Sequence, residues 1–304
     1  MKDIIFATAV TAGVLFSGSQ AGATELWDPH LRGVDEGLAA GAALPPGLYG
    51  VLNSWYAPFD QFDSNGSKTG LKVDVFVEAP ILLWQSNFKI LGGAYSAAIA
   101  EPFDYTNVKA SNVAALSNNG HWGTFNTLII PGQLAWALPN DFHIKAGLTI
   151  NVNDASTSPA TPPSTSGVGS GNGFWTVQPD LGISWMHDGW DLSANGHYAF
   201  NLKNPKTGYT SGQEIAIDYT ATKTIGKWTV GLGGYSENQV TNDSGRGAAG
   251  CAAKGGCKVA IYGIGPMVEY DLGGALAMAE YNTPISARND VAGPVFNFRL
   301  VKAF

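Results

Sequence analysis

Nine ionisable side chains stand on the polar faces of four stretches in which apolar and polar residues alternate. A period of two places successive side chains on opposite faces of a strand, so these nine would share one wet surface. In a β-barrel that surface is the lumen, where ionisable groups set charge selectivity or bind the polar end of a substrate. The alternative is a set of interior salt bridges that fills a small barrel. The expected lumen-lining residues are Lys72, Asp74, Glu78, His143, Lys145, Asp191, His197, Glu214 and Asp218.

Motifs for other chemistry are incomplete. The five histidines lack the short spacing of paired metal ligands, and the chain has no GxSxG nucleophile motif. Gly167–Gly173 has the glycines of a phosphate loop without the Lys-Ser/Thr that follows them in such loops. Asp63–Gly66 starts like a calcium loop but lacks the distal Glu. We therefore predict no catalytic residue, no metal site and no cofactor.

The segments that carry the nine residues are long. The clearest alternation runs over Phe142–Asn153. The others cover Trp190–Asn201, Gln213–Thr222 and Lys72–Glu78, and Phe76 breaks the polar face of the last one. Strands of soluble proteins average ~5–6 residues, whereas a tilted strand that crosses a membrane needs ~9–11. Strands of a soluble sandwich also alternate apolar and polar residues, so alternation alone does not decide between the two folds. The length of the segments favours a membrane barrel.

The connections alternate between short and long. About five are short and rich in Gly, Asn, Asp and Pro, as at Gln85–Asn87, and about six are long and polar, as at Ala57–Thr69. This asymmetry is typical of outer-membrane barrels, whose short turns face the periplasm. The sequence thus predicts an all-β, transmembrane, antiparallel up-and-down β-barrel of about twelve strands, with short periplasmic turns and long extracellular loops.

Composition agrees with this fold class. Charged residues make up 13 % of the 304 residues, and glycine is abundant at 39. The mature chain has no apolar run of the ~18 residues that a membrane-spanning helix needs. A net charge of −7 argues against a nucleic-acid partner, because such proteins carry a basic surface.

Both ends of the chain indicate export to the outer membrane of a Gram-negative bacterium. Residues 1–23 have the features of a signal peptide, with cleavage expected near Ala23. Residues 24–46 lack periodicity and are expected to form an irregular arm, in the periplasm or tucked into the barrel mouth, before a barrel over 47–304. The terminal Phe304 resembles the signal that the barrel-assembly machinery reads. The other expected partners are outer-membrane lipid and a small-molecule substrate.

Several short motifs, taken in order, point to one family. They are Leu44–Tyr49 (LPPGLY), Asn195–Tyr219 (NGHYAFNLKNPKTGYTSGQEIAIDY), Gly233–Tyr235 (GGY), Gln239–Gly247 (QVTNDSGRG) and Gly263–Pro266 (GIGP). With these motifs the chain resembles the SphA-like family of outer-membrane transporters, named after the meta-pathway of phenol degradation. The resemblance implies an outer-membrane barrel that takes up hydrophobic or aromatic compounds.

Cys251 and Cys257 are the two cysteines of the chain. In an oxidising compartment we expect them to form a disulfide, and the alternative is two free thiols in a loop. The family resemblance does not include this pair.

The functional prediction is a passive outer-membrane channel for small, hydrophobic or aromatic compounds, and not an enzyme. The first alternative is a structural or adhesive barrel without transport, which a closed lumen would favour. The second is a barrel-embedded hydrolase. It is less favoured because His143 and His197 have no evident Ser partner at the membrane rim.

Overall fold

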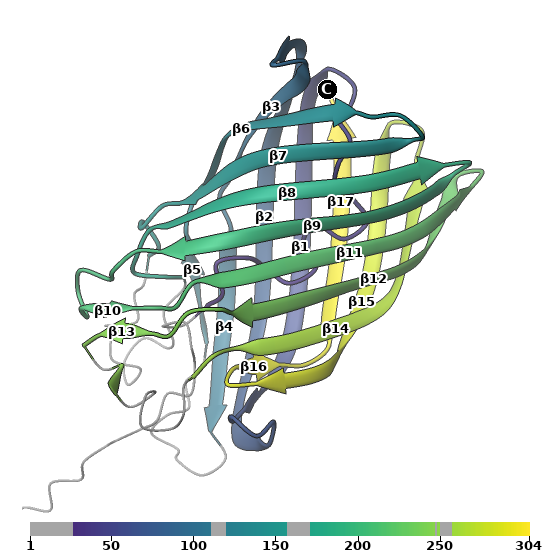
Figure 1. The fold of residues 1–304 in the computed structure, drawn as a ribbon. Helices are drawn as coiled ribbons and strands as arrows, with labels where there is room; N and C mark the ends of the chain where they lie inside the picture. Colours follow the sequence, from purple (N-terminus) through teal and green to yellow (C-terminus); the bar gives the residue numbers. More distant parts are fainter. Residues whose placement is uncertain (1–26, 111–119, 157–170, 247, 250–256) are drawn as a thin grey trace, which may run out of the picture.

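The protein forms a closed antiparallel β-barrel (Figure 1). The computed structural model describes residues 27–110, 120–156, 171–246, 248–249 and 257–304. Twelve strands form the ring, which closes because β1 pairs with both β2 and β17. In ring order they are β1 (Gly47–Phe62), β2 (Lys68–Ile90), β3 (Gly93–Ala100), β6 (Leu128–Ala137), β7 (Phe142–Asn151), β8 (Thr176–His187), β9 (Trp190–Asn201), β11 (Glu214–Ile225), β12 (Trp228–Gln239), β14 (Ala260–Asp271), β15 (Ala275–Arg288) and β17 (Val295–Ala303).

Five shorter strands extend or flank the ring. They are β4 (Phe103–Ala110), β5 (His121–Thr124), β10 (Tyr209–Thr210), β13 (Ser244–Gly245) and β16 (Val291–Ala292). β3 and β4 pair in succession with the long β2, and Glu101–Pro102 interrupts them. Proline cannot donate a ladder hydrogen bond, which accounts for a break at this point. In the described parts of the chain, no helix is long and apolar enough to cross a membrane.

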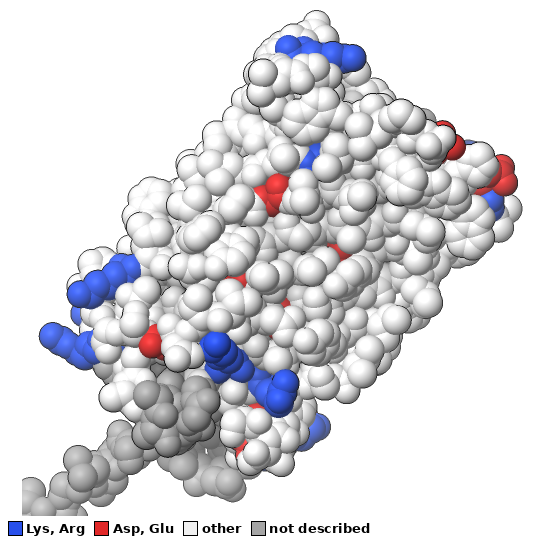
Figure 2. All heavy atoms as spheres, viewed as in Figure 1, with Lys and Arg blue, Asp and Glu red and all other residues white. Residues whose placement is uncertain are grey.

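The two faces of the barrel wall differ in chemistry, as the alternation predicts. On β9, Ser193, Asn195 and His197 are buried towards the lumen, while Leu192 and Phe200 are exposed on the outside. Apolar residues on the outer surface match the hydrocarbon of a bilayer. Figure 2 shows the consequence: on the face drawn, Lys and Arg gather mainly towards the ends of the barrel.

Tight turns join the strands at the end of the barrel where the C-terminus lies (Figure 1). Asn140 and Asp141 have φ values of 60° and 64°, and Asp188 and Gly189 have values of 48° and 73°. Two consecutive positive φ values are the signature of the type I′ hairpin turn, and Asn, Asp and Gly tolerate this backbone region best. Trp190, next to one of these turns, is exposed, as expected of an interfacial aromatic residue.

Two expected connections were wrong. Gln85–Asn87 is not a turn, because β2 continues to Ile90 and the chain reverses at Leu91–Gly92. Gln85 is buried, and its side chain donates a hydrogen bond to the carbonyl of Tyr95. This polar residue therefore belongs to the inner face of a strand and not to a turn. The long loop expected over Ala57–Thr69 is also shorter, since β1 runs to Phe62 and β2 starts at Lys68.

Candidate functional site

The candidate site is the lumen, which contains the N-terminal arm, here defined as residues 27–46. The arm forms a series of turns, with backbone hydrogen bonds such as Val34 N–H to the Leu31 carbonyl and Glu36 N–H to the Gly33 carbonyl. It runs inside the barrel, where its polar groups bond to inward-facing side chains of many strands (Figure 1). The described arm therefore lies deeper than a position in the periplasm or at the barrel mouth.

Arg32 makes the most highly charged contact between the arm and the wall. Its guanidinium donates to Glu237 (2.5 Å), to Asp290 (2.7 Å) and, within the arm, to Asp28. A further hydrogen bond goes to the Val291 carbonyl at 2.6 Å. The Arg32 side chain is buried, so removal of it would leave several carboxylates without their cation in a dry environment, which is costly.

A second contact joins two histidines and two aspartates. Asp218 on β11 accepts hydrogen bonds from the backbone N–H groups of Gly33 (3.2 Å) and Asp35 (2.9 Å), and lies 3.0 Å from Nε2 of His30. Across the cluster, Nε2 of His197 on β9 lies 2.8 Å from Oδ2 of Asp35. The rings of His30 and His197 stack with centroids 4.2 Å apart.

In each aspartate–histidine pair, the partner shifts the pKa of the arm residue in the direction opposite to the effect of burial. Burial alone would raise the pKa of Asp35, but the hydrogen bond and charge of His197 outweigh it and hold that pKa below its usual range. Burial would lower the pKa of His30, and the Asp218 carboxylate reverses this, so the net shift of that pKa is upward. Both pairs therefore favour a charged contact between the arm and the wall.

Glu36 and Arg299 form the third contact. The Arg299 guanidinium on β17 donates to the backbone carbonyls of Glu36, at 2.7 Å, and of Val34. The Glu36 carboxyl accepts hydrogen bonds from Asn282 at 2.9 Å and 3.0 Å and lies near Glu280. Burial and the neighbouring Glu280 raise the pKa of Glu36 to about 11, so this carboxyl is protonated at neutral pH.

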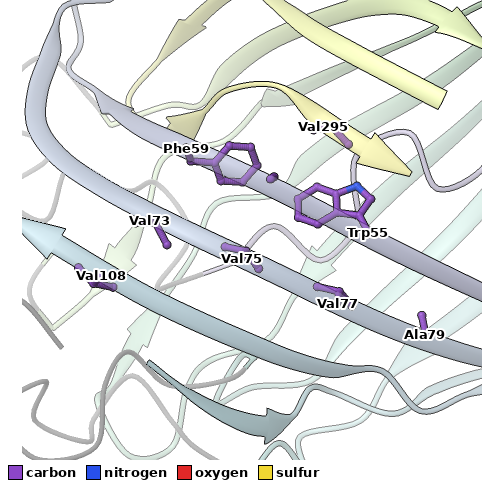
Figure 3. Close-up of a cluster of buried hydrophobic side chains, with 9 residues drawn as sticks. Trp55, Phe59, Val73, Val75, Val77, Ala79, Val108 and Val295 are labelled. Atoms are coloured by element: carbon purple, nitrogen blue, oxygen red, sulfur yellow. The ribbon is translucent and has the colours of Figure 1, made fainter. Parts of the chain in front are cut away.

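Between the arm and the β1–β2 side of the wall lies an apolar cavity of ≈ 120 Å³. Its lining is mainly hydrocarbon and aromatic, and His30, Arg32 and the carboxylates of Asp28, Asp104 and Asp290 add polar groups. Figure 3 shows several of the lining residues, with Trp55 and Phe59 on β1 close to the row of Val75, Val77 and Ala79 on β2. The apolar residues that contribute to the lining are Trp27, Pro29, Leu31, Val34, Trp55, Phe59, Val75, Val77, Ala79, Ile81, Ala100, Pro102, Phe125, Leu128 and Val291.

Residues 59–300 match the model of a protein family described as "Putative MetA-pathway of phenol degradation". The chain belongs to this family. Because the match spans most of the barrel, the family assignment rests on the wall rather than on the arm, which precedes the matched region. No curated protein sequence matches the chain.

Solved structures give the fold of this family member. The chain is similar to an outer-membrane channel of Pseudomonas putida F1, with a TM-score of 0.73 at 13 % identity over 89 % of this chain and 100 % of that chain. It also matches the translocator domain of the autotransporter NalP from Neisseria meningitidis, with a TM-score of 0.48 at 9 % identity over 86 % of this chain and 90 % of that one. The first likeness shows that the family member has an outer-membrane β-barrel fold.

Six of the nine side chains expected to line the lumen are on the inward face of this family member. They come from three strands, with two residues each on β7, β9 and β11. His197 and Asp218 contact the arm directly. The six residues are His143, Lys145, Asp191, His197, Glu214 and Asp218.

The other three were wrongly expected to face inward: Lys72, Asp74 and Glu78 on β2 lie on the outer face. Asp74 forms an ion pair with Lys109 of β4 at 2.8 Å, and Glu78 accepts a hydrogen bond from Ser54 of β1 at 3.0 Å. The physical reason is that the lumen is apolar here. The valines between these three residues are buried inside in one cluster with Trp55 and Phe59. Two of them, Val75 and Val77, line the cavity.

Sequence reasoning missed the residues that hold the arm. Arg32 and Glu36 are in a segment without periodicity, so no pattern pointed to them. Glu237, Glu280 and Arg299 are ionisable residues within long strands, and a search for every charge at inward parity would have found them.

The expected disulfide falls partly outside the described residues. Cys257 is buried and disulfide-bonded, while Cys251 lies outside the described residues. The pairing of Cys251 with Cys257 stays a prediction, as does the signal peptide at residues 1–23, which also lies outside the described parts.

Proposed function

We propose that this barrel is an outer-membrane channel for the passive uptake of small hydrophobic compounds, with single-ring aromatics as the preferred class. The observation that carries the proposal is the apolar cavity between the arm and β1–β2. A dry apolar cavity of ~150 Å³ is large enough to bind benzene in another protein, so ≈ 120 Å³ is the right scale for one small ring. The family's description, which names phenol degradation, supports the same class.

The lining favours transient rather than tight binding. Trp55 and Phe59 offer ring faces and edges, and the valines of β2 offer a surface without hydrogen-bonding groups. An apolar guest would gain the hydrophobic contribution of ~25 cal/mol per Å² removed from water, which for a small ring is modest. Weak binding at an intermediate position is what a passive channel requires, because the compound must also leave.

One observation favours a second candidate. The arm occupies the lumen and is held by buried charged contacts, notably at Arg32 and Arg299. If these contacts never open, the molecule is a structural or adhesive barrel without transport. The uptake experiment below distinguishes the two candidates.

A Val77→Trp substitution should reduce the uptake of a labelled single-ring aromatic compound by intact cells several-fold. Val77 is buried on the cavity wall, so the larger indole would occupy the space of the guest. The measurement is the initial rate of uptake in a Gram-negative host that lacks other aromatic channels, at equal amounts of heat-modifiable protein in the outer membrane.

Leu82→Trp is the matched control. Leu82 is on the same strand with its side chain exposed on the outside, so the same substitution there should leave the rate unchanged. Equal rates for the wild type, both variants and cells without the protein would rule out uptake through this cavity and leave the structural barrel.

A further inference from the structure

We propose that His30, Asp35 and His197 form a binding site for one divalent transition-metal ion of the Zn²⁺ class, which ties the arm to the barrel wall. Each residue offers one ligand atom, and these atoms all lie within 4.8 Å of one another. Two of the ligands come from the arm and one from β9, so a bound ion would bridge the two parts. The inference concerns how the arm is held and does not depend on which compound the channel takes up.

The donor set suits such an ion. Zn²⁺ is bound by imidazole nitrogen and carboxylate oxygen at ~2.0–2.2 Å, which places ligands of one ion roughly 3.4 Å apart. The ligand atoms here lie within 4.8 Å of one another, which is wider than the spacing around a bound ion. A modest inward movement of the side chains would bring them to that spacing. Two imidazoles and one carboxylate leave further coordination positions for water.

A carboxylate already supports one of the two rings. Nε2 of His30 lies 3.0 Å from Asp218, and Asp218 is itself fixed by the backbone N–H groups of Gly33 and Asp35. Metal-binding histidines usually present their second nitrogen to such a carboxylate, which orients the ring and increases its basicity. With Nε2 occupied in this way, Nδ1 of His30 is the nitrogen available to an ion.

An unpartnered atom is the independent sign of a missing ligand. Nδ1 of His197 is buried, with the residue 8 % exposed, and has no hydrogen-bond partner among the described residues. The same holds for Oδ1 of the neighbouring Asn195. A buried polar atom without a partner is destabilising, and a cation bound through Nδ1 of His197 would give this nitrogen a partner.

The surroundings attract a cation and leave it a way in. Asp180 is directly opposite His197 in the β8–β9 pair, so three aspartates surround the two rings, with Lys145 as the nearby cation. The Asp35 side chain remains 22 % exposed, which gives an ion access to the cluster. The sequence could not show this site, because positions 30 and 35 are far from position 197 along the chain.

The test is a titration of the chelator-stripped, folded protein with Co²⁺, which reports its ligands through its visible absorption, followed by competition with Zn²⁺. The protein carries no polyhistidine tag. We expect one Co²⁺ per chain, displaced by Zn²⁺, and at least tenfold weaker binding in His30→Gln and in His197→Gln. Heat-modifiable gel migration shows that each variant is folded, and glutamine retains a hydrogen-bonding group so that the arm can remain in place.

His187→Gln is the matched control, because His187 is exposed at the turn end of β8 and pairs with Asp141, away from the cluster. Its Co²⁺ affinity should equal that of the wild type. The proposal is overturned if the folded wild type binds no stoichiometric Co²⁺, or if the two cluster variants bind it as well as His187→Gln does. In either case the histidine–aspartate pairs hold the arm without a metal.

Discussion

Deletion of residues 27–45 should raise the single-channel conductance of the barrel several-fold and leave the barrel folded. The deleted segment fills the lumen with the Arg32, His30 and Glu36 contacts, whereas the strand pairing that closes the wall begins at Gly47. Stability of a membrane barrel comes from its closed hydrogen-bonded wall, so the wall should form without the arm. The measurement is planar-bilayer recording on purified protein at matched salt.

Arg32→Ala is the corresponding single substitution. It leaves Glu237 and Asp290 buried without their cation, so the arm should be displaced more often and brief openings should become more frequent. If the deletion variant is folded and conducts like the wild type, the arm does not obstruct the lumen.

A Leu181→Arg substitution should destabilise the folded barrel in lipid by ~2–4 kcal/mol. Leu181 is in the middle of β8, and its side chain is 56 % exposed on the outer face, so the guanidinium would be placed in hydrocarbon near the bilayer midplane. The measurement is the free energy of refolding into lipid vesicles, read from heat-modifiable gel migration.

Ser193→Arg is the matched control on the other strand of the same hairpin. Ser193 faces the lumen and already donates a hydrogen bond to Asp191, so the new guanidinium would have an anionic partner. This variant should refold with a smaller loss of stability and should alter conductance or ion preference instead. Equal losses for Leu181→Arg and Ser193→Arg would contradict the assignment of the two faces.

Much of the barrel wall was predictable, because the alternation of its side chains and the chemistry of its turns depend on residues close together in the sequence. On β7, β9 and β11 alternation separates lipid-facing from lumen-facing side chains within about ten residues, and hairpin turns such as Asp188–Gly189 carry their own backbone signal. Strand number followed from the alternation of short and long connections. These features depend on neighbours along the chain, which the sequence shows directly.

The face of β2 was not predictable by the same rule. The rule assumes a polar lumen, and it placed Lys72, Asp74 and Glu78 inside. Here the lumen is apolar, because Trp27 and Leu31 of the arm pack against the cluster that contains the β2 valines. Phe76, on the same face as the three ionisable residues, was the one residue in the stretch that argued for the opposite orientation.

The arm's position depends on contacts that no local pattern contains. His30 meets Asp218 across 188 positions, and Arg32 meets Glu237 across 205. A segment with turns, prolines and scattered charges looks the same in sequence whether it extends into the periplasm or fills a lumen. Its burial became evident only with the three-dimensional structure.

Amide hydrogen exchange can establish whether the arm lies inside the lumen. The N–H groups of Asp35, Gly37 and Gly41 donate to Asp218, Thr220 and Ser184 of the wall at 2.9 Å, 2.9 Å and 2.8 Å. Arm peptides of the mature protein in lipid nanodiscs should therefore exchange as slowly as the strands, and Thr220→Val should speed exchange near Gly37 alone. Complete exchange of residues 28–41 at the first time point, with the strands still protected, would show that the arm does not lie inside the lumen.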